Sequence, residues 1–213
     1  MKKIFLSLQV TLLAGIAVAQ TYPEPEFSNE VYYLKKDSAY TVVRLEKGHS
    51  KMEQKGSAIG GYESGYSLDG AKSSVRFSNG NNLSFVISTG SSSGSSSHKS
   101  DSTMQANGMD PSMMQGMSSM FDPTSSISLY KVESSKGERK VILQKSGSAL
   151  PFANHKPRSS DKYTFSMKKI RQGYWELVID KPLPKGEYAF TMMNVMGGDA
   201  MAGSTLLFAF AID

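Results

Sequence analysis

The spacing of the apolar residues constrains this chain more than any other feature. No segment has the sustained three-and-four spacing of an amphipathic helix, whereas short runs of alternating apolar and polar residues recur along the sequence. Turn-forming residues separate these runs, of which there are about nine or ten. The pattern predicts an all-β protein, folded as an antiparallel β-sandwich or a partly open barrel.

Turn signals divide the chain into predicted hairpins. Residues 74–77 and 83–87 flank the sequence SNGNN, and residues 127–132 and 139–143 flank a turn that contains SSKG. Both arrangements are typical of a hairpin. Residues 56–70 contain five glycines, so we expect a loop or an irregular edge strand there.

Two features indicate where the core lies. The final run, residues 204–212, is apolar at nearly every position, which predicts a central strand covered on both faces. Residues 163–167 and 174–179 alternate cleanly, so their odd-numbered side chains should face the core. The alternative is that these aromatic residues stack on sugar rings. The predicted core residues are Tyr163, Phe165, Met167, Trp175, Leu177 and Ile179.

The first 19 residues have the layout of a secretory signal peptide. Lys2 and Lys3 precede an apolar run that ends in Ala17-Val18-Ala19. We expect cleavage after Ala19, because small residues occupy the two positions that signal peptidase reads. The run is too short and too broken for a transmembrane helix. The chain is therefore expected to be exported to the periplasm or the cell surface of a Gram-negative bacterium.

The mature chain of 194 residues, left after 19 of 213 are removed, suits one domain. Residues 20–28 are Pro-rich and predict an extended leader, and residues 29–213 predict a single β domain. Within it, residues 89–122 form a low-complexity insert rich in Ser, Gly and Met. Such a segment buries too little apolar surface to offset its ordering entropy, so we expect a disordered loop.

Composition excludes several classes of protein. The chain has no Cys, which excludes disulfides, thiolate metal sites, cysteine nucleophiles and a lipid anchor on a processed Cys. Without Lys2 and Lys3, 22 basic residues face 19 acidic ones, a net charge of +3. The basic residues are scattered, so no nucleic-acid partner is expected. No later segment is long and apolar enough to cross a membrane.

A series of short motifs carries a family resemblance. They are NEVYYL (29–34), LEKG (45–48), DGAKSSVRF (69–77), ISLYKVESSKGERKV (127–141), PLPKGEYAF (182–190) and a terminal FAFAID. Over most of the mature chain, the sequence resembles a group of exported proteins from Bacteroidetes-type bacteria that have no assigned activity. The resemblance implies a β-rich exported fold and assigns no functional residues.

Methionine is concentrated in the insert. Six methionines fall within seventeen residues, and the sequence around them is too polar to form a core. Thioethers are soft ligands that prefer Cu(I) or Ag(I) and remain usable in oxidising compartments. A Cu(I) site is one hypothesis, and a flexible filler or docking segment is the preferred one. The candidate ligands are Met109, Met113, Met114, Met117 and Met120, with His98 or His155 as a nitrogen donor.

Two tripeptides resemble the Asp-Ser/Thr acceptor of bacterial O-glycosylation. They place Ser38 and Ser102 as candidate acceptors, although ordinary Asp-capped turns share this pattern. His49, His98 and His155 are expected in loops, and no serine lies in a nucleophile elbow. Glu176 and Glu187, on strands expected to pair, are the one carboxylate pair to consider for glycoside chemistry, although a solvated outer-face position is preferred for both.

These observations together favour an exported, non-catalytic protein with a structural or binding role. Its partners would be envelope proteins or glycans, and no cofactor is expected. The first alternative is a periplasmic methionine-rich protein that binds Cu(I) or Ag(I). The second is a carbohydrate-binding or carbohydrate-active module.

Overall fold

The computed structural model describes residues 21–57, 61–89, 126–135, 137–146, 158–193 and 204–213. Every named element in these ranges is a β-strand, so the predicted all-β class is confirmed. Within the same ranges there is no helix with the length and hydropathy needed to span a bilayer. The predicted insert lies almost entirely outside the described residues.

The strands follow one another closely along the chain. Their bounds are β1 Val31–Lys36, β2 Tyr40–Arg44, β3 Glu46–Lys51, β4 Glu53–Ser57, β5 Gly61–Asp69, β6 Arg76–Phe77, β7 Ser84–Ser88, β8 Ile127–Ser135, β9 Glu138–Ser146, β10 Lys162–Tyr163, β11 Phe165–Arg171, β12 Tyr174–Ile179, β13 Gly186–Met193 and β14 Ser204–Ile212.

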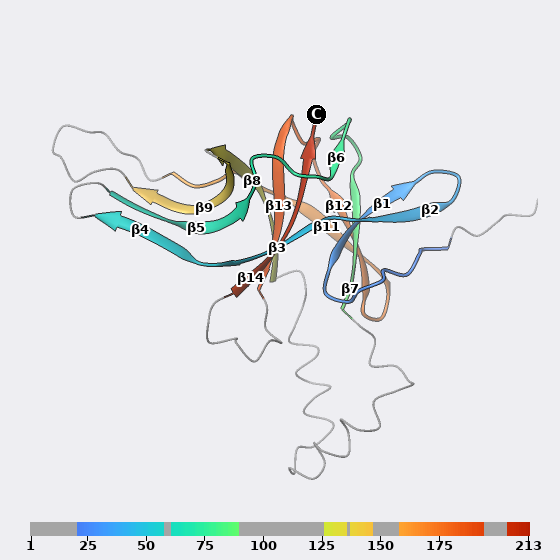
Figure 1. Cartoon of the computed structure of the whole chain (residues 1–213). Coiled ribbons are helices and arrows are strands. Elements are labelled where there is room, and N and C mark those ends of the chain that lie inside the picture. The colour runs from blue at the N-terminus through green and yellow to red at the C-terminus, as the bar shows by residue number, and fades with distance from the viewer. Residues whose placement is uncertain (1–20, 58–60, 90–125, 136, 147–157, 194–203) are drawn as a thin grey trace, which may run out of the picture.

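The strands form two sheets that pack as a sandwich (Figure 1). One sheet has five strands in the order β11-β12-β7-β1-β2, and the other has the path β3-β14-β13-β8-β9-β5-β4. Two short strands join the second sheet at its side, β10 beside β8 and β6 beside β14. Neighbours pair antiparallel except β6 and β14, which pair in parallel over two residues. The predicted antiparallel sandwich is confirmed.

The larger sheet curls into a half-barrel. Its two end strands, β3 and β4, are consecutive in the chain and are separated only by Met52. The curl brings β3 back beside β5, where the N–H of Ser67 donates to Ser50 Oγ at 3.0 Å. Gly48 of β3 makes room for this approach, because a Cβ there would lie 2.1 Å from Leu68 Cδ2.

Strand β14 lies at the centre of the molecule, as its sequence predicts. Residues 205–212 are all buried, and β13 and β3 pair with its two edges. Its even-numbered side chains, among them Phe208 and Phe210, pack into the core between the two sheets. Leu207 and Ala209 point the other way, into the half-barrel, where Tyr66, Leu68 and Val141 meet them.

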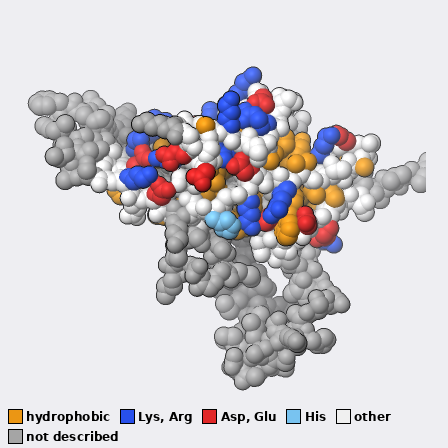
Figure 2. Space-filling view, viewed as in Figure 1, with side chains coloured by type: hydrophobic (Ala, Val, Ile, Leu, Met, Phe, Trp, Pro, Cys, Tyr) orange, Lys and Arg blue, Asp and Glu red, His pale blue; other side chains and the backbone are white. Residues whose placement is uncertain are grey.

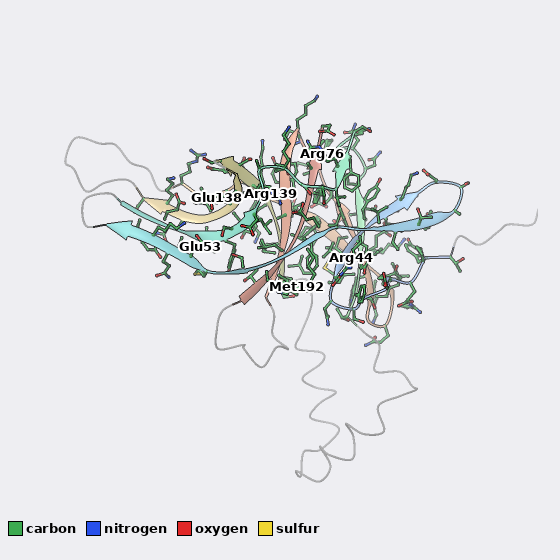
Figure 3. The ribbon with its side chains drawn as sticks, in the orientation of Figure 1. Arg44, Glu53, Arg76, Glu138, Arg139 and Met192 are labelled. Atoms are coloured by element: carbon green, nitrogen blue, oxygen red, sulfur yellow. The ribbon has the colours of Figure 1, made fainter. Side chains whose placement is uncertain are left out.

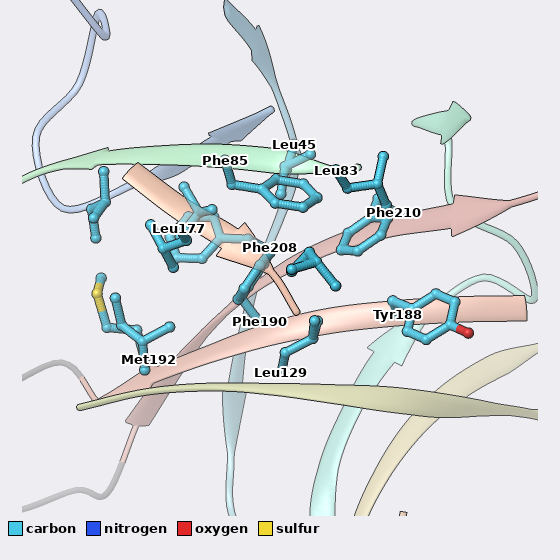
Figure 4. Packing of buried hydrophobic residues seen from close by; sticks show 14 of the residues in the cluster. Leu45, Leu83, Phe85, Leu129, Leu177, Tyr188, Phe190, Met192, Phe208 and Phe210 are labelled. Carbon is cyan, nitrogen blue, oxygen red and sulfur yellow. The ribbon is translucent and has the colours of Figure 1, made fainter. Parts of the chain in front are cut away.

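Aromatic rings fill the core between the sheets (Figure 4). Phe210 lies 5.0 Å from Phe85 and 5.5 Å from Tyr188 between ring centroids, and Phe190 lies 4.9 Å from Phe85. The predicted odd-numbered faces of β11 and β12 also join this core. Leu177 and Ile179 are buried within it, and the partly buried Tyr163, Phe165, Met167 and Trp175 pack against it.

One of the two predicted hairpins is present. Strands β8 and β9 pair antiparallel next to their turn, over residues 133–135 and 138–140, which confirms the hairpin there, whereas residues 127–132 pair with β13. The hairpin predicted for 74–77 and 83–87 is wrong, because β6 pairs with β14 and β7 lies in the other sheet. The connection between them crosses from one sheet to the other. Gly80 is held there by the N–H of Leu183, which donates to its carbonyl oxygen at 3.0 Å.

For the Gly-rich stretch 56–70 the sequence predicts a loop or an irregular edge strand, which fits residues 56–57 in the edge strand β4 but is wrong for residues 61–69. The stretch contains the nine-residue strand β5, which lies between β4 and β9. Here glycine serves close packing rather than a turn: a Cβ on Gly65 would lie 2.1 Å from the carbonyl oxygen of Val141. The bulge between Ser64 and Gly65 marks the same contact.

The outer face of the five-stranded sheet is also covered. Tyr32, Leu34, Val86 and Tyr174 are buried there, and Tyr22 from the N-terminal leader packs against them. The Tyr22 ring meets the Tyr40 and Tyr174 rings edge-on, at centroid distances of 5.3 Å and 6.4 Å. Residues 21–28 contain no strand, so side chains rather than a β-ladder fix the leader to the sheet.

We expect Phe210→Ala to lower the free energy of unfolding by about 3–5 kcal/mol, because it leaves a cavity among rings of both sheets. Val43→Ala, on the exposed side of an edge strand, should cost less than about 1 kcal/mol. Chemical denaturation followed by tryptophan fluorescence measures both values. Equal losses in the two variants would contradict a core centred on β14.

Candidate functional site

A shallow polar groove lies on the half-barrel where β4, β5 and β9 meet. Carboxylates and ammonium groups alternate around it, and Gly65 forms its floor beside Val141. The lining residues are Glu53, Lys55, Glu63, Ser64, Gly65, Tyr66, Ser67, Lys140, Val141 and Ile142. Basic and acidic side chains lie close together over this part of the surface (Figure 2), and Glu53 is labelled beside β4 in Figure 3.

The two carboxylates of the groove each have a cation or a hydroxyl as partner. Glu53 accepts a hydrogen bond from Ser67 Oγ and lies 2.9 Å from Lys55 Nζ. Glu63 lies 2.6 Å from Lys145 Nζ and 3.6 Å from Lys140 Nζ. The Ser67 bond lowers the pKa of Glu53, and the Lys145 bond lowers that of Glu63. Both groups are therefore ionised at neutral pH, whereas glycoside hydrolysis needs one protonated carboxyl.

The carboxylate pair selected from the sequence is not a pair in the structure. Glu176 lies on β12 in the five-stranded sheet, and Glu187 lies on β13 in the half-barrel sheet, so their strands do not pair. Neither side chain is on a solvated outer face, because Glu176 is 1% exposed and Glu187 is 9% exposed. The prediction fails because alternation along one strand does not reveal which strand lies beside it, nor what covers its outer face.

Glu176 is paired with a hydroxyl and an ammonium group at the point where the leader crosses the five-stranded sheet. Tyr22 donates its hydroxyl to Glu176 Oε2 at 2.8 Å, and Lys36 forms an ion pair with Oε1. Burial alone would raise the pKa of this carboxyl, but the bonds from Lys36 and Tyr22 outweigh it, and the net pKa is lowered. Burial and the same carboxylate raise the pKa of Tyr22 to about 12. Glu176 thus holds the leader onto β12.

A second buried ionic cluster ties the loop before β6 to the half-barrel. Arg139 on β9 is 1% exposed, and its guanidinium forms an ion pair with Glu46 on β3. It also donates to the carbonyl oxygens of Asp69 and Gly70. Glu187 accepts from the backbone N–H of Ser73 at 2.8 Å. Every charge in this cluster has a partner, which is typical of structural ion networks.

Arg76 extends the same cluster to the end of the chain. Its guanidinium donates to Glu187 Oε1 at 2.9 Å and also binds the Asp213 carboxylate. Hydrogen bonds from Arg76 lower the pKa of Asp213. The two-residue pairing of β6 with β14 is thereby reinforced by side chains.

The residues predicted as sites are mostly outside the described ranges. Met109, Met113, Met114, Met117, Met120, His98, His155 and Ser102 all lie there. Ser38 is described, and it is exposed in the turn between β1 and β2, next to an ion pair of 2.7 Å between Lys35 and Asp37. His49 is expected in a loop from the sequence, but it lies in β3 opposite Leu206.

Among the described residues, no group of three or more His, Asp or Glu side chains is placed to hold a metal ion. Met192 is buried in the core between the sheets, and Met52 is exposed where β3 passes into β4. Comparison with protein-family models, with curated proteins and with solved structures gave no match.

We predict that the protein loses stability as the pH falls below about 4.5, the ordinary glutamate value, because Glu176 has a lowered pKa. A carboxyl with a lowered pKa in the folded state stabilises the fold above its unfolded pKa, and this contribution disappears on protonation. Glu176→Gln should be less stable at pH 7 and should lose less between pH 5 and pH 3. Denaturant unfolding across this pH range measures both slopes, and parallel curves would contradict the assignment.

Proposed function

We propose that this chain is an exported, non-catalytic protein of the bacterial envelope, with a structural or binding role in the periplasm or at the cell surface. The observation that carries the proposal is the secretory-type N-terminus directly before the fold. Lys2, Lys3 and the apolar run end at Ala19, and Tyr22 already packs on the five-stranded sheet. The contacts of Tyr22 with the described residues all involve partners C-terminal to Ala19, so cleavage there retains them.

The chemistry of the described surface supports a role without catalysis. The carboxylates of the groove are held ionised by Ser67 and by lysines. The buried carboxylates Glu176 and Glu187 hold the leader and the loop before β6. Glu53, Glu63 and Glu176 have lowered pKa values and are ionised at neutral pH, whereas an acid-base catalyst needs a group whose pKa lies near the working pH.

We expect the protein recovered from the periplasm or the medium of a bacterial host to lack its first 19 residues. Intact-mass measurement of the secreted fraction checks this. Replacing Ala17 and Ala19 with Arg should block processing, because signal peptidase requires small residues at both positions. The precursor would then accumulate in the membrane fraction. An unprocessed wild-type protein in the cytoplasm would refute export.

Cu(I) or Ag(I) binding is the second candidate function, favoured by six methionines within seventeen residues of polar sequence. The full-length mature protein should then bind Cu(I) more tightly than about micromolar in competition with a chelator. Replacing Met113, Met114, Met117 and Met120 with Leu should weaken binding at least about tenfold. Binding weaker than micromolar, or unchanged in this variant, would rule the candidate out.

A further inference from the structure

The free strand edges of the described structure differ in how they are protected. Sheet edges usually carry lysines, bulges or glycines that discourage pairing with another chain. Strand β11 ends the five-stranded sheet with the exposed Lys168 and Lys169 and a bulge before Arg171. Strand β4 ends the half-barrel sheet with Glu53, Lys55 and Gly56. These two edges have the usual devices against association.

Strand β2, at the other end of the five-stranded sheet, has no lysine, bulge or glycine, and its one charged side chain is already bound to Glu30. Its sequence is Tyr-Thr-Val-Val-Arg, with three consecutive β-branched residues, and it pairs with β1 on one side only. Thr41 and Val43 are exposed, Val43 by 40%. Among the described residues, no strand pairs with its second edge. An unprotected edge of this composition is a template for an added strand.

The sequence of β2 complements itself. When two copies of β2 pair antiparallel with Val42 opposite Val42, all five residues of each strand have a partner. This register places Tyr40 opposite Arg44 and Thr41 opposite Val43. The first pair places the aliphatic stem of Arg44, whose guanidinium stays on Glu30 and Phe27, beside an aromatic ring, and the second brings two β-branched side chains together. Each favourable pair occurs twice, because a twofold axis passes through Val42.

The flanking side chains of β2 are already held in place. Arg44 donates to both oxygens of Glu30, at 2.9 Å and 3.0 Å, and its guanidinium lies 4.5 Å from the centroid of the Phe27 ring. At the other end, Tyr40 packs edge-on against Tyr22. Because these side chains are already ordered, pairing costs less side-chain entropy. Arg44 is labelled near the centre of Figure 3, at the end of β2 that leads into β3.

We propose that β2 pairs antiparallel with β2 of a second copy of this chain, which joins the two five-stranded sheets into one continuous sheet across a twofold axis. The interface is a strand edge, and it requires neither the groove nor the methionine-rich segment. It also does not depend on export, so the failure of either proposal leaves the other standing.

The test introduces charges at Thr41 and Val43, two exposed positions that face each other across the twofold axis. Thr41→Lys with Val43→Lys places like charges opposite each other twice, and it should weaken dimerisation by at least about tenfold. Thr41→Glu with Val43→Lys places opposite charges there, and it should keep the wild-type affinity or exceed it. The control is Gln54→Lys with Gln144→Lys, which adds the same charge at exposed positions of β4 and β9 and should leave dimerisation unchanged.

Sedimentation velocity over a range of protein concentrations measures the dimer affinity, and thermal unfolding shows whether each variant folds. Hydrogen exchange of wild-type protein provides a second readout that needs no variant. Amides of 40–44 should exchange more slowly as the concentration rises, and those of 53–57 should not change. A wild-type protein that stays monomeric at all concentrations, or a Lys/Lys variant that dimerises like wild type, overturns the proposal.

Discussion

The rest of the structure depends on the burial of β14 from both sides. One face of this strand packs against the five-stranded sheet, and the other fills the half-barrel. The larger sheet must curl to cover the second face, because a flat sheet would leave Leu207 and Ala209 in water. Gly48 and Gly65 permit the curl by allowing β3 and β9 to approach β5 closely. The hydrophobic effect at one strand thus determines the shape of the whole sheet.

Buried charge is the second constraint. Arg139, Glu30 and Glu176 are almost inaccessible, and each has partners of opposite charge. Ionised groups in such positions cost free energy unless they are paired and hydrogen-bonded. Their partners come from irregular segments and strand ends, so the ion pairs fix the leader and the loop before β6. Hydrogen bonds from Arg44 and Lys36 outweigh the effect of burial and lower the pKa values of Glu30 and Glu176, so both carboxylates are ionised near neutral pH.

The exposed surface divides into two kinds. On the face drawn in Figure 2, the half-barrel shows interleaved charges, whereas hydrophobic side chains gather near β6 and the five-stranded sheet. Phe27 of the leader and Val43 of β2 are both exposed, and the Arg44 guanidinium lies over the Phe27 ring. Large apolar side chains at the surface are common singly, but beside an unprotected strand edge they favour association.

The sequence by itself determined the all-β class, the central position of β14, the β8–β9 hairpin and the inward faces of β11 and β12. These follow from local alternation and turn residues, which a strand carries wherever it lies in a sheet. Only the tertiary structure decided that β6 joins β14, that β5 is a strand, and that Glu176 and Glu187 are buried in different sheets. Strand pairing and outer-face cover involve residues far apart in sequence, such as Tyr22 and Glu176, and no local pattern records them. The same reason applies to the free edge of β2: it is known only after strand pairing shows which strands lie beside β2.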